Sequence, residues 1–238
     1  MSHKNGALYL VPTPIGNLAD FTRRAMEVLE QVDVVACEDT RHSGSLLKKL
    51  GLHKKLISYH DFNEADRAAQ LLEALHEGKS IAVMTDAGSP GISDPAYRVV
   101  KLATENDITV IPLPGPTAII PALTASGLPT DRFFFEGFLP NKSAARQNRL
   151  AKLKDMDHTL VFYESPHRVH KSLTEMLNTL GDRPACLARE ISKLHEEFIR
   201  GTIESVLEKI SGKTIKGEVV LIVAGRPKSA RKGKGDEE

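Results

Sequence analysis

The feature that most constrains the fold of this chain is the regular alternation of short apolar runs and helix-like segments through its first half. The apolar runs read ALYLVP, VDVVAC, LISY, SIAVMT and ITVIPL. Residues 22–30 and 64–77, between these runs, have the apolar spacing of amphipathic helices. Buried strands joined by helices are typical of a parallel sheet. The first half therefore predicts a mostly parallel sheet with helices on both faces.

A second series of strand-like runs follows the segment PLPGP at 112–116, the densest Pro and Gly punctuation in the chain. These runs read RFFFEGFL, HTLVFYE, ACLARE, EEFIRGTI and GEVVLIVAG. Some follow one another without a helix between them, which indicates antiparallel pairing within a mixed sheet. We therefore expect an N-terminal α/β domain at 1–114, a C-terminal α/β domain at 115–225, and a basic, flexible tail at 226–238.

The charge and cysteine content exclude several classes of protein. A formal net charge of +1 over 238 residues excludes nucleic-acid binding through a uniformly positive surface, so any such contact must be local. The basic stretch at 141–154 is a candidate contact, although a solvated helix face would look the same. Cys37 and Cys186 lack the spacing of a zinc site or a disulfide framework. With no apolar stretch of the roughly 20 residues that span a membrane, we expect a cytoplasmic protein.

Small and polar residues gather at four of the predicted strand ends. The segments are TPIGN at 13–17, CEDTRHSG at 37–44, TDAGSPGISDP at 85–95 and PGPTA at 114–118. Because parallel strands end at a common edge, these four loops are expected to converge on one crevice. The loop at 85–95 is longer than a strand-to-helix connection needs, which favours a ligand loop. None of the four matches a phosphate-binding P-loop or a G-x-G-x-x-G turn.

The long loop also ends on a helix-start signal. Asp94 is a residue type that caps helices, and Pro95 is favoured at the first helical position. The pair predicts a helix that begins at Pro95 with Asp94 as its cap.

Two further polar segments follow strands in the second half, YESPHR at 163–168 and REISKLHEE at 189–197. Their carboxylates, lysine and arginines are groups that can deprotonate a hydroxyl or hold a phosphate. Surface ion pairs would give the same composition, so the residues alone leave both interpretations open. His42, His60 and Asp61 lie near loop ends without the spacing of metal ligands, and no metal site is predicted.

Seven of these segments, taken in order from about residue 7 to 225, resemble the tetrapyrrole methylase superfamily of S-adenosylmethionine-dependent enzymes. They read VPTPIGNL, ACEDTRHSG, TDAGSPGISDP, PLPGPTA, FFEGFLP, YESPHR and RE-S-K-HEE. They look most like the branch that methylates ribosomal RNA. Where porphyrin-modifying members generally carry a Gly-Asp-Pro turn, this chain has Asp86 to Pro90 reading DAGSP.

The resemblance implies two α/β domains with S-adenosylmethionine in the cleft between them, and a homodimer. It implies methyl transfer to the ribose 2'-hydroxyl of a cytidine in the decoding region of 16S rRNA, with free rRNA or the small ribosomal subunit as partner. By motif, the residues implied to bind the cofactor are Pro14, Asp86, Gly88, Pro90, Ile92, Thr117, Ala118, Tyr163 and Glu164. Those expected to contact RNA are Arg41, Lys142, Arg146, Arg149, His167 and Arg168.

For the reaction we expect Glu190 or Lys193 to assist removal of the hydroxyl proton, with Arg189 or Arg168 holding an adjacent phosphate. Orientation alone can supply much of the rate, which would leave a base unnecessary. Two other functions stay open: methylation of a precorrin-type tetrapyrrole, and a non-catalytic role as an RNA-binding protein in ribosome assembly.

Overall fold

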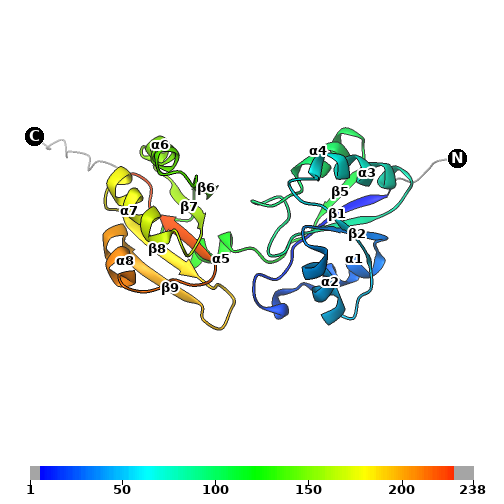
Figure 1. The fold of residues 1–238 in the computed structure, drawn as a ribbon, viewed down its shortest axis with the longest axis horizontal. Helices are drawn as coiled ribbons and strands as arrows, with labels where there is room; N and C mark the ends of the chain where they lie inside the picture. Colours follow the sequence, from blue (N-terminus) through cyan, green and yellow to red (C-terminus); the bar gives the residue numbers. More distant parts are fainter. Residues whose placement is uncertain (1–5, 228–238) are drawn as a thin grey trace, which may run out of the picture. The chain divides into compact units, whose positions relative to one another are not determined.

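The computed structural model describes residues 6–227, which divide into two compact units between Ala118 and Ile119. Each unit is a β-sheet covered by helices (Figure 1). The expectation of two α/β domains is confirmed.

The sheet of the first unit has five parallel strands. They are β1 (Ala7–Val11), β2 (Val34–Cys37), β3 (Lys55–Ser58), β4 (Ile81–Met84) and β5 (Thr109–Pro112). Their order across the sheet is β3-β2-β4-β1-β5, and every pairing is parallel. The central strands β2 and β4 are buried along their whole length, as expected for a parallel sheet covered on both faces. The predicted parallel sheet is confirmed.

Helices cover both faces of this sheet. They are α1 (Arg23–Gln31), α2 (Thr40–Lys49), α3 (Glu64–His76) and α4 (Tyr97–Glu105), with the 3-10 turn η1 (Leu18–Asp20) before α1. Leu29 of α1 and Leu47 of α2 pack in one apolar core, and Leu71 of α3 and Val99 of α4 pack in the other. The connection after β4 therefore leads to the opposite face from those after its neighbours β2 and β1. In open α/β sheets, ligands bind beside the strand ends at such a switch.

Two local predictions in this unit are wrong at their helix starts. The segment 37–44 is not a loop throughout, because the Asp39 carboxylate accepts hydrogen bonds from the backbone of Arg41 and His42 and starts α2 at Thr40. Conversely, α4 begins at Tyr97 rather than Pro95, and Asp94 does not cap it. The Asp94 carboxyl is instead partly buried near the negative charges of Glu38 and Asp86, and burial and those charges raise its pKa.

The sheet of the second unit is mixed. Its strands are β6 (Phe133–Phe138), β7 (Thr159–Glu164), β8 (Pro184–Arg189), β9 (Glu197–Thr202) and β10 (Val219–Val223). Their order is β6-β7-β10-β8-β9, with β6 and β7 parallel and the other pairings antiparallel. The predicted antiparallel component is confirmed. Because β6 and β7 are parallel, their carboxyl ends meet at one edge, where the loops 139–142 and 165–168 begin.

Three helices pack on this sheet around one apolar core: α6 (Ser143–Leu153), α7 (Val169–Leu180) and α8 (Ile203–Ile210). A shorter helix, α5 (Ile119–Ala125), opens the unit. Of the expected tail at 226–238, only Arg226 and Pro227 fall among the described residues. No helix between residues 6 and 227 is both long enough and apolar enough to cross a membrane.

Candidate functional site

The loops after β1, β4 and β5 are tied together at the carboxyl edge of the first sheet. Thr13 and Gly88 exchange backbone hydrogen bonds, with N–O distances of 2.9 and 3.0 Å. The Thr13 hydroxyl also donates to the Thr85 carbonyl at 3.0 Å, and the Ser89 hydroxyl donates to the Pro116 carbonyl at 3.1 Å. The predicted convergence of these loops is confirmed.

The backbone conformation at position 88 favours glycine. Its φ of 87° lies in the left-handed region, where a side chain is strained. This conformation lets the Gly88 backbone turn back onto Thr13 and link the two loops.

The cofactor residues expected in the first unit all lie at this edge. Pro14 and Asp86 line a common cavity of about 300 Å³, and Gly88 forms the link just described. Pro90 is buried, and Ile92 keeps 40% of its surface exposed. Thr117 and Ala118 are half-buried at the end of the loop that follows β5.

Four carboxyl groups at the same edge form an acidic cluster that the sequence interpretation missed. They are Glu38 after β2, Asp61 after β3, and Asp86 and Asp94 on the loop after β4. Burial, followed by the charges of Glu38, Asp86 and Asp61, raises the pKa of Asp94 to about 7. Burial and the charges of Asp86 and Asp61 likewise raise the pKa of Glu38. All four follow strands, which is the signal that could have identified the cluster.

The cluster makes this edge favourable for a positively charged ligand. The Oδ1 atom of Asp86 is buried and has no hydrogen-bond partner among the described residues. A buried carboxylate oxygen without a donor is costly unless a ligand or solvent satisfies it. By contrast, no group of histidine, cysteine and carboxylate side chains in residues 6–227 has the arrangement of a metal site.

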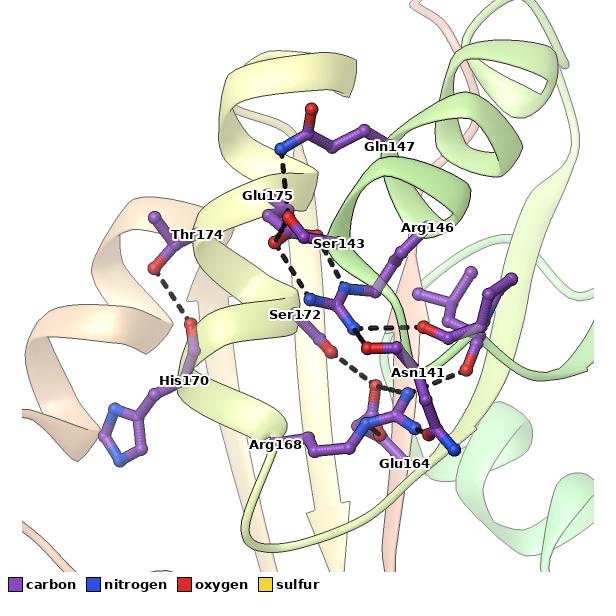
Figure 2. Close-up of polar contacts among 12 residues, drawn as sticks. Asn141, Ser143, Arg146, Gln147, Glu164, Arg168, His170, Ser172, Thr174 and Glu175 are labelled. Atoms are coloured by element: carbon purple, nitrogen blue, oxygen red, sulfur yellow. Dashed lines mark hydrogen bonds and ion pairs between the residues drawn. The ribbon is translucent and has the colours of Figure 1, made fainter.

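In the second unit, Tyr163 and Glu164 end strand β7 as expected, but the Glu164 carboxylate is turned inward (Figure 2). Its side chain is fully buried and forms an ion pair with Arg168 at 3.0 Å. It also accepts hydrogen bonds from the Ser172 hydroxyl and the Ser165 backbone. The protein's own donors thus occupy the Glu164 carboxylate. Tyr163 is half-buried.

Arg168 connects this carboxylate to the neighbouring loop, as Figure 2 shows. Its guanidinium donates to the Leu139 carbonyl at 2.7 Å and to the Asn141 side chain. The ends of β6 and β7 are therefore joined through one arginine. His167 and Lys142, on the two joined loops, remain exposed.

The expectation that Arg146 contacts RNA is contradicted by its burial. The Arg146 side chain is only 1% exposed and is paired with Glu175 of α7 at 2.5 Å. Its guanidinium also donates to the carbonyls of Pro140 and Asn141, so its donors are used inside the protein (Figure 2). The cause is its position on α6, where it shares a face with Leu150 and Leu153.

Arg149 and Arg41, which were also expected at the RNA surface, have protein partners too, but both are accessible. The Arg149 guanidinium binds both oxygens of Glu136 and is 38% exposed, and Arg41 is 91% exposed while paired with Asp39 at 3.0 Å.

The structure brings the expected catalytic residues Glu190 and Lys193 together. The Lys193 ammonium lies 2.9 Å from the Glu190 carboxylate and 3.1 Å from that of Glu218. The hydrogen bond from Lys193 lowers the pKa of Glu190. Burial acts to lower the pKa of Lys193, but its bonds to the two carboxylates outweigh burial and raise it. Both groups are thus held in their charged forms, and Arg189 is paired with Glu197 at 2.7 Å.

Comparison with known proteins defines the family. Residues 7–207 match the family of Tetrapyrrole (Corrin/Porphyrin) Methylases. The chain therefore belongs to this family.

Two relatives with higher sequence identity carry the same, more specific name. The chain is 47% identical to a ribosomal RNA small subunit methyltransferase I from Micromonospora olivasterospora, over 94% of this chain and 72% of the relative. It is 49% identical to the protein of the same name from Haemophilus influenzae, over 96% of this chain and 82% of the relative. Its fold is similar to that of a uroporphyrin-III C-methyltransferase from Thermus thermophilus complexed with S-adenyl homocysteine. The TM-score is 0.61 at 21% identity, covering 92% of this chain and 97% of the other.

Proposed function

We propose that this protein is an S-adenosylmethionine-dependent methyltransferase whose substrate is the RNA of the small ribosomal subunit. The observation that carries the proposal is the acidic carboxyl edge of the first sheet, formed by the loops that bear the family's motifs. The names of the 47–49% identical relatives support rRNA as the substrate.

The chemistry of this edge fits the proposed cofactor. S-adenosylmethionine supplies an electrophilic methyl group on a positively charged sulfonium, and the carboxyls around Asp86 favour a cation. The unsatisfied Asp86 oxygen offers an acceptor to the cofactor's hydroxyl or ammonium donors. Gly88 is itself buried, and its positive φ turns the loop that carries Asp86 back onto Thr13. We assign binding to Pro14, Asp86, Gly88, Pro90, Ile92, Thr117 and Ala118, with Tyr163 and the backbone of Glu164 from the second unit.

The proposed acceptor is the ribose 2'-hydroxyl of a cytidine in the decoding region of 16S rRNA. In the reaction the oxygen forms a bond to the methyl carbon, the carbon–sulfur bond breaks, and the hydroxyl proton leaves to a base or to water. The enzyme's main task is to place the oxygen in line with the methyl group, at about 3 Å.

The charge states of Glu190 and Lys193 refine their proposed roles. A lysine held protonated by two carboxylates is a poor base but can stabilise negative charge that develops on the acceptor oxygen. We therefore assign Lys193 an electrostatic role and Glu190 the role of orienting it. Arg189 is the proposed contact to an adjacent phosphate.

The experiment is methyl transfer from labelled S-adenosylmethionine to small subunits that lack the modification, with the labelled nucleotide mapped and tested for 2'-O-methylation. Label on a single cytidine ribose of the decoding region is the expected result. Methylation of a precorrin-type substrate without transfer to RNA would instead identify a tetrapyrrole methylase. Subunit binding without S-adenosylmethionine binding would identify an assembly protein.

A further inference from the structure

The first unit contains a cavity of about 300 Å³ with a basic side chain on one wall and an acidic side chain on the other. One wall is helix α2, which contributes His42, Ser45 and Lys49. The other wall is the one already described, with Pro14 and Gly16 from the loop after β1 and Asp86 from the loop after β4.

The three polar residues of α2 form a single stripe. Their spacing of three and four residues places them on one face of the helix, and the cavity lies along that face. All three are exposed. Among the described residues, no hydrogen bond or ion pair holds the Lys49 ammonium or the Ser45 hydroxyl, whereas Arg41 on the same helix is paired with Asp39. Lys49, Ser45 and His42 thus present an unpaired ammonium, a hydroxyl and an imidazole to the same cavity.

We propose that this cavity binds a phosphate group of the RNA substrate, held by Lys49 and His42 with Ser45 as a hydroxyl donor. The proposal rests on the proposed function and adds a substrate subsite to it. Lysine is a point-charge binder of phosphate, and hydroxyl groups commonly donate to phosphate oxygens. The volume lies at the lower end of ligand pockets, about 300–1,000 Å³, which suits a ribose-phosphate unit.

The acidic cluster fixes the direction in which the RNA backbone approaches. Inside the cavity Asp86 repels a phosphate and Lys49 attracts it, so the phosphate is expected against α2 rather than against the loop after β4. Glu38, Asp61 and Asp94 do not line the cavity and repel phosphate from the rest of the edge. A cationic cofactor is favoured on the acidic side. Charge alone therefore separates the two ligands, and the shared wall residue Asp86 places the phosphate subsite next to the cofactor loops.

The test compares alanine variants at three positions on α2, two of them adjacent lysines. Lys49→Ala and His42→Ala remove the proposed contacts, and Lys48→Ala removes an exposed lysine that does not line this cavity. KM for small subunits is measured as a function of salt, and S-adenosylmethionine affinity is measured separately by calorimetry. All three residues are exposed, so the variants are expected to fold, and circular dichroism checks this.

We expect Lys49→Ala to raise KM about tenfold and to reduce the slope of log KM against log salt by roughly one phosphate contact. His42→Ala should raise KM by a smaller factor, and Lys48→Ala should stay within twofold of wild type. Cofactor affinity should be unchanged in all three.

Two results would overturn the inference. Equal KM values and salt slopes for Lys49→Ala and Lys48→Ala would mean that no phosphate binds in the cavity. A loss of cofactor affinity with unchanged subunit affinity would assign the cavity to the cofactor. Failure of the proposed function is distinguishable, because the wild type itself would then transfer no methyl group to small subunits.

Discussion

At the residue scale, Asp94 provides a test of the acidic cluster that does not depend on activity. Its pKa of about 7 in the folded state exceeds the ordinary value of 3.8. Between these values the folded protein binds more protons at this site than the unfolded chain, so the free energy of unfolding falls as pH rises from about 4 to 7. Above pH 7 the full cost of the buried charge is present.

We therefore expect Asp94→Asn to be more stable than wild type at pH 8, by about 1–2 kcal/mol once partial exposure is allowed for. The two proteins should converge below about pH 4, where Asp94 is protonated in both the folded and the unfolded state. Urea unfolding at both pH values measures the difference. Asp131→Asn, at an aspartate whose side chain is 76% exposed, serves as control and should show no such change. Parallel pH profiles for wild type and Asp94→Asn would contradict the clustering of these carboxyls.

A second residue-scale prediction separates backbone strain from function at Gly88. Gly88 and Gly127 have similar φ values, 87° and 81°, and an added Cβ has no steric contact within 3.4 Å at either position. Alanine at either should cost about 1–2 kcal/mol of stability through the left-handed conformation. Only Gly88→Ala should also weaken S-adenosylmethionine binding, by an expected fivefold or more in calorimetry. Equal cofactor affinity in the two variants would show that Gly88 does not contribute to cofactor binding.

At the scale of elements, a buried ion pair joins α6 to α7. Arg146 and Glu175 are 1% and 8% exposed, and the arginine also holds the loop carbonyls of Pro140 and Asn141. Removing one partner leaves an uncompensated buried charge, so Arg146→Ala is expected to cost about 3–5 kcal/mol. Arg23→Ala, in a surface pair on α1 that is 93% and 50% exposed, should cost less than about 1 kcal/mol.

Chemical denaturation of the full chain measures both variants. Should Arg146→Ala prove too unstable to purify, Glu175→Gln keeps the shape and hydrogen-bonding capacity of the site and gives a smaller loss in the same direction. A loss under 1 kcal/mol in both would show that the pair contributes no more than an exposed one.

The sequence was sufficient for the strands but not for every helix face. Runs such as VDVVAC and GEVVLIVAG are apolar because both faces of their strands are covered, so they could be recognised without tertiary information. Arg146 was assigned to a solvated basic face by its charge. Its spacing from Leu150 and Leu153 carried the opposite signal, but only the partner Glu175 on α7 makes burial of that charge possible.

Some features of the candidate site could likewise be predicted from the sequence, and others could not. Convergence of the first unit's loops follows from strand order in a parallel sheet, and was predictable. The inward turn of Glu164 depends on Ser172, and the second carboxylate that holds Lys193 protonated comes from Glu218, 25 residues further along the chain. No local sequence pattern predicts such contacts.

At the scale of the whole molecule, the distribution of charge matters more than its sum. The net charge is +1, yet the first unit separates an acidic cluster from the basic stripe on α2. In the second unit, Lys142 and His167 are exposed on the joined loops after β6 and β7. RNA is therefore expected to be held by a small number of local phosphate contacts rather than by a general positive field.

This arrangement sets the expected salt dependence of RNA binding. Three phosphate contacts, for example, give a loss of about 20- to 40-fold in subunit affinity between 50 and 200 mM salt, because log affinity falls by roughly 0.7–0.9 per contact for each decade of salt. Affinity for S-adenosylmethionine, a small ligand beside partly buried carboxyls, should change much less over the same range. Filter binding of small subunits and calorimetry with the cofactor measure the two slopes. A thousandfold salt effect on subunit binding would require many more phosphate contacts. The exposed basic residues at these loops of the described chain could not supply them, so the main RNA-binding surface would have to lie elsewhere.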